Sequence, residues 1–165
     1  MSETTSNLNW SNIKLFAMDV DGVLTDAGLY LSETGEEQKK FSIVDGLGLV
    51  LCREEGIELA WISGRMSGAT TRRANELKIP HLVQGHVDKI SALKAIIEQL
   101  GVTAEETVYM GDDTIDASAI AHAGIGVAVP EAQDPALEAA NYITKRSGGN
   151  GAVREVCNLI LQARS

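Results

Sequence analysis

Acidic residues occur in two short groups whose spacing suits chemistry on a phosphate group. Asp19 and Asp21 lie two residues apart in the first group, and Asp112 and Asp113 are adjacent in the second. In an extended chain, residues i and i+2 point to the same side, so Asp19 and Asp21 can act on one bound molecule. If Asp112 joined them, the three charges would repel and raise their own pKa values unless a cation shared the site.

The ligands that these acids offer favour Mg²⁺ over softer metals. They are oxygen atoms, with no flanking cysteine and no histidine at metal-binding spacing, and such a set suits a hard cation. Mg²⁺ characteristically takes one or two carboxylates together with waters and phosphate oxygens. We therefore expect Asp19, Asp21 and Asp112 to bind Mg²⁺, with Asp21 contributing its backbone carbonyl.

The same acids can supply a nucleophile and a proton carrier. An Asp19 oxygen can attack phosphorus and form an acyl-phosphate, which divides one difficult step into two easier ones. The Asp21 carboxyl can then protonate the departing oxygen and later take a proton from water. The sequence thus predicts a phosphatase that passes through a phosphorylated Asp19.

Neutral and positive donors are needed around the transferring phosphoryl group, because its charge is spread over its outer oxygens. The hydroxyl of Ser63 and the amide of Gly64 provide neutral donors after a predicted strand. Lys89 provides a point charge at the start of a predicted helix. We expect Ser63 and Lys89 to complete the catalytic site.

The elements that must position these residues alternate between strands and helices. Short apolar runs predict buried strands over residues 13–20, 57–62, 107–110 and 125–129, and helical spacing predicts helices after Asp45 and Asp88. This alternation favours an α/β fold, a Rossmann-like parallel sheet with helices on both faces. Ligands bind at the carboxyl ends of strands in such sheets, where all three polar motifs fall.

Two segments depart from this alternation. Residues 28–44 predict a projecting β-hairpin flap, with strands at 29–31 and 39–44 around a turn that contains Gly35. Residues 147–165 predict a flexible glycine-rich hinge followed by an amphipathic helix. We expect a single domain over residues 1–165 that begins with a polar segment over 1–12.

The bulk composition excludes several classes of partner. The chain has 165 residues and a formal net charge of -9, which repels nucleic acid and anionic membranes. Cys52 and Cys157 lie in apolar helical patterns, as reduced and packed thiols do, so we expect a cytoplasmic protein. The polar N-terminal segment and the lack of a long apolar run predict neither export nor membrane insertion.

Taken together, the motifs resemble the four motifs of the haloacid dehalogenase superfamily. The matching segments are Asp19-Val-Asp21-Gly22-Val23-Leu24-Thr25, Ser63-Gly64-Arg65, Lys89 and Gly111-Asp112-Asp113-x-x-Asp116. The first motif, the short insert before Ser63 and the segment from Gly148 to Glu155 are similar to its capless branch, which contains the 3-deoxy-D-manno-octulosonate 8-phosphate phosphatases. The resemblance implies Asp19 as nucleophile, Asp21 as acid/base, Ser63 and Lys89 as phosphate binders, and Mg²⁺ on Asp19, Asp21 and Asp112.

The resemblance also implies a substrate and an assembly. The substrate is a sugar-acid phosphate of lipopolysaccharide precursor synthesis, and its expected contacts are Asp21, Asp45, Gly46, Gly64, Arg65, Arg73 and Lys89. The assembly is a homotetramer in which flap hairpins associate and a C-terminal tail reaches toward a neighbour's active site. Because the branch has no cap domain, a neighbouring subunit could shield the reaction from water.

Three positions depart from the pattern of this branch. Val44 and Val50 stand where relatives often carry arginine, and Asn150 replaces a residue that is charged in many relatives. We therefore expect two basic substrate contacts to be absent, while Arg65 and Arg73 still match positions that bind the sugar acid.

Four functions agree with this pattern. The first is hydrolysis of the eight-carbon sugar-acid 8-phosphate, and the second is hydrolysis of a nine-carbon 2-keto-3-deoxy sugar-acid 9-phosphate. The third is a noncatalytic oligomerising module, which has little reason to retain every acid of the site. The fourth is a phosphotransferase, which uses the same acids and differs only in the acceptor.

Overall fold

The structure, a computed structural model, describes residues 7–165 and is built on a six-stranded parallel sheet. The strands follow the order β5-β4-β1-β6-β7-β8, and every neighbouring pair is parallel. Their bounds are β1 Leu15–Met18, β4 Glu58–Ile62, β5 His81–Val83, β6 Thr107–Gly111, β7 Ile125–Ala128 and β8 Tyr142–Ile143. The predicted Rossmann-like α/β fold is confirmed.

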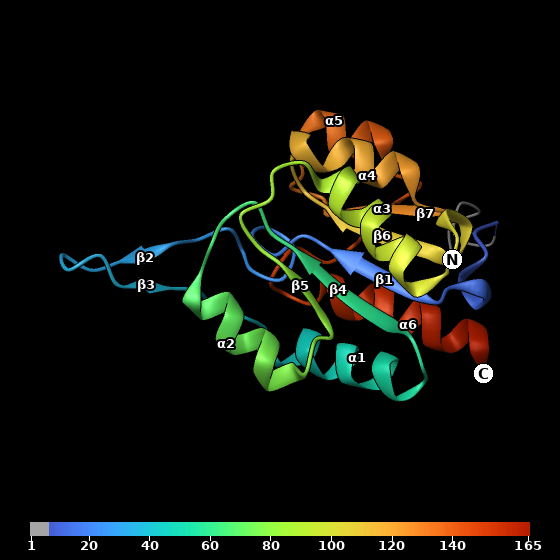
Figure 1. Cartoon of the computed structure of the whole chain (residues 1–165), viewed down its shortest axis with the longest axis horizontal. Helices are drawn as coiled ribbons and strands as arrows, with labels where there is room; N and C mark the ends of the chain where they lie inside the picture. The colour runs from blue at the N-terminus through green and yellow to red at the C-terminus, as the bar shows by residue number, and fades with distance from the viewer. Residues whose placement is uncertain (1–6) are drawn as a thin grey trace.

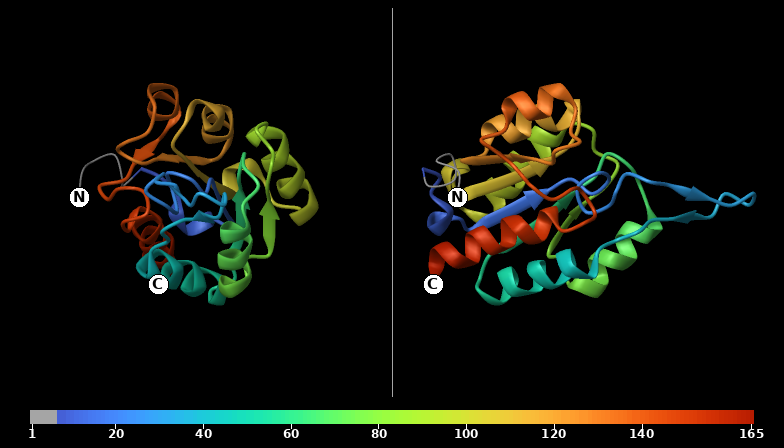
Figure 2. Two further views of the ribbon diagram at one scale, coloured as in Figure 1. Left: turned by 90° about the vertical axis from the view of Figure 1, so that its left-hand side faces the viewer. Right: turned by 180° about the vertical axis from the view of Figure 1, so that it is seen from behind.

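Helices cover both faces of the sheet (Figures 1 and 2). One face carries α1 (Ile43–Glu54), α2 (Gly68–Leu77) and α6 (Ala152–Arg164), and the other carries α3 (Lys89–Leu100), α4 (Ala117–His122) and α5 (Asp134–Ala139). Three 3₁₀ turns complete the set: η1 (Trp10–Asn12), η2 (Ala104–Glu106) and η3 (Thr114–Asp116). None of the helices within residues 7–165 is long and apolar enough to cross a membrane.

Burial on both faces explains why the central strands are continuously apolar. Every residue of β1 and β6 is buried, as expected for a parallel sheet between two helical layers. The register pairs Met18 of β1 with Trp61 of β4 on one side and with Met110 of β6 on the other. The three strands therefore end side by side at one edge, called here the crest of the sheet.

Side-chain caps fix where three of the helices begin. Ser42, Ser67 and Asp88 accept hydrogen bonds from backbone amides in the first turns of α1, α2 and α3, which satisfies amides that have no partner within the helix. The cap at Asp88 makes Lys89 the first residue of α3 and places it at the crest.

The flap hairpin projects from the crest end of the molecule (Figure 1). Its strands are β2 (Tyr30–Leu31) and β3 (Glu37–Gln38), with Tyr30 opposite Gln38. The predicted second strand at 39–44 is wrong, because the Lys39 side chain turns inward to Asp21 and Ser42 starts α1. Within residues 7–165, this hairpin is the insertion between the first two strands of the main sheet, and no cap domain is present.

The glycine run expected to form a flexible hinge is a packed turn. Gly148, Gly149 and Gly151 are buried, and the Gly149 amide donates to the carbonyl of Val23 at 3.0 Å. A Cβ atom at Gly148 would overlap the carbonyl oxygen of Gly22. The run therefore braces the loop that follows β1.

The C-terminal helix packs on its own chain. Helix α6 lies along α1, and its end lies opposite the hairpin in the right-hand view of Figure 2. Residues 152–164 thus cover the chain's own sheet, and a contact of the C-terminal segment with a neighbouring active site stays a prediction.

The close contact between Gly148 and Gly22 gives a stability prediction. Gly148→Ala should lower the free energy of unfolding by about 1–3 kcal/mol, the usual range for overpacking, because the new methyl group has no space. The matched control is Gly68→Ala, since a Cβ atom at Gly68 in α2 meets nothing within 4 Å. Urea unfolding of both variants checks this, and equal stability of the two would contradict the packed turn.

Candidate active site

Three loops from adjacent strands meet at the crest. Asp19 follows β1, Ser63 follows β4 and Asp112 follows β6, so the sheet brings together residues far apart in sequence. The amide of Asp19 donates to the carbonyl of Met110 at 2.9 Å, which extends the pairing between the first and third of these strands.

A cluster of three carboxylates lies at this point. Asp19, Asp112 and Asp116 each place one oxygen atom within 4.8 Å of the others. Asp19 and Asp116 are buried and Asp112 is half-buried. The structure therefore brings Asp19 and Asp112 together as predicted, and it adds Asp116, which we did not predict as a member of the site.

Asp116 anchors the loop that carries Asp112. Its carboxylate accepts hydrogen bonds from the hydroxyl of Tyr109 at 2.7 Å, the amide of Asp112 at 3.2 Å and the amide of Asp113 at 3.1 Å. The Asp113-x-x-Asp116 spacing, which forms a capping box at η3, was the sequence signal for this contact. Asp113 instead caps η3, where its side chain accepts from the amide of Thr114.

Lys89 is the ammonium group of this cluster. Its Nζ donates to Asp19 Oδ1 and to the carbonyl of Ile62, both at 2.7 Å, and lies 3.3 Å from Asp116 Oδ1. Burial lowers the pKa of Lys89, but the Asp19 and Asp116 carboxylates more than offset this, so the net shift is upward. Lys89 therefore stays charged, as a phosphate binder must.

One ammonium does not balance three carboxylates. Burial raises the pKa of Asp19, and the Asp116 charge raises it further. Burial also raises the pKa of Asp112, and the neighbouring Asp19 charge adds to the shift. If all three acids are ionised, Lys89 leaves a charge of about -2 in the cluster, the amount that a dication neutralises.

The local geometry fits Mg²⁺. Among the described residues, Asp112 Oδ1 is a buried oxygen with no hydrogen-bond partner, an arrangement that native proteins avoid unless an ion or water completes it. Gly22 has φ +86°, and a Cβ atom there would overlap the Asp112 carboxylate. The glycine of the first motif thus allows Asp112 to approach the loop after β1.

The side chain of Asp21 lies outside the carboxylate cluster. Asp21 Oδ1 pairs with the Nζ of Lys39 at 2.8 Å, and Asp21 is not among the three acids that gather within 4.8 Å. That position agrees with a metal contact through the backbone carbonyl and with a proton-transfer role for the carboxyl, both of which stay predictions.

A hollow of about 220 Å³ opens over the cluster, and its lining includes Asp19, Asp21, Gly64, Arg65 and Asp112. A larger hollow of about 910 Å³ lies along α6 and the segment from β8 to Gly151, and its lining contains none of these residues. The smaller hollow is the candidate active site because the titratable groups with shifted pKa values converge there.

Ser63 and Arg65 flank this hollow on the β4 side. Ser63 is buried, and its hydroxyl accepts from the amide of Arg65 at 3.3 Å. The guanidinium of Arg65 pairs with Glu37 of the hairpin at 2.9 Å. Arg65 lines the hollow and Ser63 lies buried beside it, and contacts of the two with a phosphoryl group or its ester stay predictions.

Four expected substrate contacts are absent from the lining of the hollow: Asp45, Gly46, Arg73 and Lys89, of which Lys89 contacts Asp19. Asp45 is buried and accepts from the amide of Arg154 at 2.8 Å, so it holds the start of α6. Arg73 pairs with Glu76 at 2.8 Å and lies against Gly46, between α2 and α1. The substrate roles of Asp45, Gly46 and Arg73 stay predictions.

Comparison with known proteins identifies the family. Residues 67–156 match the model of haloacid dehalogenase-like hydrolases. The chain is 43% identical to the 3-deoxy-D-manno-octulosonate 8-phosphate phosphatase of Yersinia pestis over 154 residues, which cover 93% of this chain and 82% of that protein. The chain belongs to the 3-deoxy-D-manno-octulosonate 8-phosphate phosphatase family of the haloacid dehalogenase superfamily.

Solved structures of this family agree closely with the fold. The phosphatase of Moraxella catarrhalis, crystallised with magnesium, phosphate and KDO, matches with a TM-score of 0.94 and 45% identity over 99% of this chain and 93% of that chain. The cobalt-bound phosphatase of Haemophilus influenzae matches with a TM-score of 0.91 and 40% identity over 94% of this chain and 91% of that chain. Both relatives hold a divalent cation.

The raised pKa values predict that Mg²⁺ binding releases protons. Carboxyls with raised pKa values hold protons near neutral pH, and a cation must displace these protons to bind. Mg²⁺ affinity should therefore weaken as the pH falls from about 9 to about 6. Calorimetric titration in two buffers of different ionisation enthalpy measures the release. Asp112→Asn should weaken binding at least about tenfold, and pH-independent binding without proton release would contradict the prediction.

Proposed function

We propose that this protein is a Mg²⁺-dependent phosphatase that hydrolyses 3-deoxy-D-manno-octulosonate 8-phosphate through a phosphorylated Asp19. One observation carries the proposal: Asp19 meets Lys89 and Asp112 at the crest of a fold shared over nearly its whole length with phosphatases of that ester. The proposal thus rests on the geometry of the site and on the family to which the chain belongs.

The contacts of Asp19 indicate which of its oxygens attacks. Lys89 occupies Oδ1, so Oδ2 is available to form the bond to phosphorus while the ester bond breaks. Mg²⁺ held by Asp19, Asp112 and the backbone carbonyl of Asp21 would neutralise the excess negative charge and polarise the phosphoryl group. The Ser63 hydroxyl, the Gly64 amide and the Lys89 ammonium would donate to the outer oxygens of that group.

Asp21 would carry the protons of both half-reactions. Its carboxyl lines the hollow beside Asp19, where it would protonate the departing sugar oxygen. It would then take a proton from the water that attacks the phosphorylated Asp19, which frees inorganic phosphate and restores the carboxylate. The Asp21 carboxyl would therefore act as an acid in the first half-reaction and as a base in the second.

The sugar-acid class of substrate is supported by Arg65 at the rim of the hollow, since a guanidinium suits a carboxylate. The eight-carbon ester is favoured over the nine-carbon ester because the relatives named above act on the former. A noncatalytic module is disfavoured because the acids and Lys89 remain in bonding contact.

Assay of purified protein with Mg²⁺ tests this function. We expect turnover of the eight-carbon 8-phosphate, with a kcat/KM at least about tenfold above that for the nine-carbon 9-phosphate or glucose 6-phosphate. Asp19→Asn should abolish turnover, because an amide cannot accept phosphorus as the carboxylate does, while its unfolding curve shows that it remains folded. Preference for an unrelated ester would overturn the substrate, and an active Asp19→Asn enzyme would overturn the mechanism.

We further infer a cytoplasmic homotetramer. The buried free thiols of Cys52 and Cys157 support a reducing compartment. Tyr30 and Leu31 in β2 are 61% and 64% exposed, and a two-stranded hairpin with apolar side chains needs a partner to be stable. Association of hairpins would supply that partner.

Sedimentation velocity tests the assembly. We expect a tetramer that dissociates in Leu31→Lys, because the charge would be buried between hairpins. Lys40→Ala, at an exposed side chain near the hairpin, is the control that should remain tetrameric. A wild-type monomer with full activity would contradict the inference.

A further inference from the structure

Lys39 places a fully buried ammonium beside the catalytic site. The residue follows β3 at the root of the hairpin, and its side chain is 0% exposed. Lysine is almost never fully buried unless it is paired, because removing the charge from water is costly. The contacts that compensate this cost therefore show what Lys39 does.

Asp21 is the closest partner of Lys39. The Nζ atom lies 2.8 Å from Asp21 Oδ1, 3.6 Å from Glu37 Oε1 and 3.4 Å from Thr70 Oγ1, to which it donates. Within residues 7–165, Lys39 is the basic side chain that pairs with Asp21. The hairpin thus reaches into the site through one charged contact.

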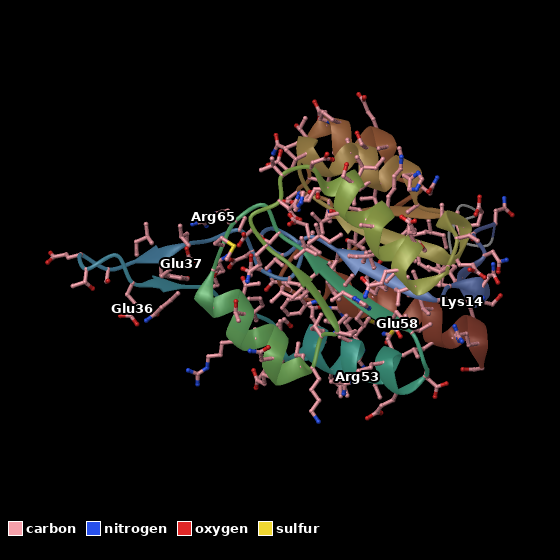
Figure 3. All side chains as sticks on the ribbon, viewed as in Figure 1. Lys14, Glu36, Glu37, Arg53, Glu58 and Arg65 are labelled. Atoms are coloured by element: carbon pink, nitrogen blue, oxygen red, sulfur yellow. The ribbon has the colours of Figure 1, made fainter. Side chains whose placement is uncertain are left out.

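Glu37 fixes the position of Lys39 from the other side. Its Oε1 accepts from the hydroxyl of Ser67 at 2.7 Å, and its Oε2 pairs with Arg65 at 2.9 Å. Figure 3 shows Glu37 and Arg65 together where the hairpin joins the body. The strand that precedes Lys39 is therefore tied to the loop after β4 and to the start of α2.

The pairing distinguishes the two oxygens of Asp21. Oδ1 is held by the ammonium, which leaves Oδ2 for the hollow that Asp21 lines with Asp19. A carboxylate held on one side by a fixed donor keeps the other oxygen in one direction. Such fixed orientation is what a proton acceptor needs to act on a water molecule.

We propose that Lys39 is a positioning residue that orients the Asp21 carboxylate for hydrolysis of the phosphorylated Asp19. In that step water forms a bond to phosphorus, the bond between phosphorus and Asp19 breaks, and the proton of the water passes to Asp21 Oδ2. Inorganic phosphate leaves and the Asp19 carboxylate is restored. This inference rests on the proposed function and assigns the hairpin a role in the second half-reaction.

Steady-state kinetics of Lys39→Met separates this role from a structural one. The value of kcat/KM reports the steps through formation of the phosphoenzyme, whereas kcat includes its hydrolysis. With the ester that the wild-type enzyme turns over fastest, we expect kcat to fall about tenfold to a hundredfold, a fraction of the usual effect of a proton acceptor. KM should also fall, and kcat/KM should fall at least about threefold less than kcat, because Asp21 also protonates the departing oxygen in the first half-reaction.

Acid quenching during turnover, followed by intact-mass measurement, provides the second readout. Lys39→Met should hold phosphate on Asp19 in most molecules, and Lys39→Arg, which retains a charged donor, should hold less. Lys40→Met is the matched control, since Lys40 is 57% exposed and lies 3.9 Å from Asp26, and it should behave as wild type. Lys39→Gln replaces Lys39→Met if the latter does not fold.

Three results would overturn the inference in an enzyme whose wild type is active. The first is an equal loss in kcat and kcat/KM without phosphoenzyme, which indicates a structural role. The second is unchanged kinetics in the Lys39 variants, and the third concerns a double variant. An Asp21→Asn enzyme should lose no further activity when Lys39→Met is added, and an additive loss would contradict action through Asp21. An inactive wild type would instead overturn the proposed function.

Discussion

The structure of the crest depends on the repulsion between clustered carboxylates, which the neighbouring ammonium group offsets only in part. Asp19, Asp112 and Asp116 gather within 4.8 Å, and Lys89 is the ammonium that contacts two of them. A folded chain can keep such a group only if a cation shares the charge or if protons bind to the acids. The same deficit makes the site receptive to Mg²⁺ and reactive toward a phosphate ester.

The sheet holds these charges together against their repulsion. The central strands are buried on both faces, so the ends of β1 and β6 are fixed by packing that does not depend on the acids. Asp116, which holds the Asp112 loop, accepts a hydrogen bond from Tyr109. The glycine turn at 148–151 packs against the loop after β1 and is hydrogen-bonded to it. The hairpin adds a further constraint, because Lys39 pairs with the Asp21 carboxylate, which lies outside the cluster of three acids.

Much of this was predictable because it depends on local pattern. The apolar runs predicted the four central strands to within two residues at each end, whereas the edge strands β5 and β8 were not predicted. Asp88 caps α3 as its type and position indicated, which placed Lys89 correctly. The convergence of Asp19 and Asp112 followed from the rule that parallel strands end at one edge.

The rest required tertiary contacts that periodicity does not encode. The second hairpin strand was placed too late because nothing local shows that Lys39 leaves the strand to pair with Asp21. The glycine run resembled a hinge because glycine serves both flexible segments and close backbone approaches. Asp116 was missed as a site residue because its role is to hold another loop. Asp45, which we predicted as a substrate contact, likewise accepts from the amide of Arg154 at the start of α6.

The most direct test of the charge balance is a crystal structure of the active enzyme grown with Mn²⁺ in place of Mg²⁺, in which anomalous scattering locates the ion. We expect the ion between Asp19 and Asp112, coordinated by oxygen atoms of both side chains, and Lys89 still on Asp19 Oδ1. An active enzyme whose ion lies elsewhere, with Asp112 Oδ1 bound to a protein group, would contradict the account.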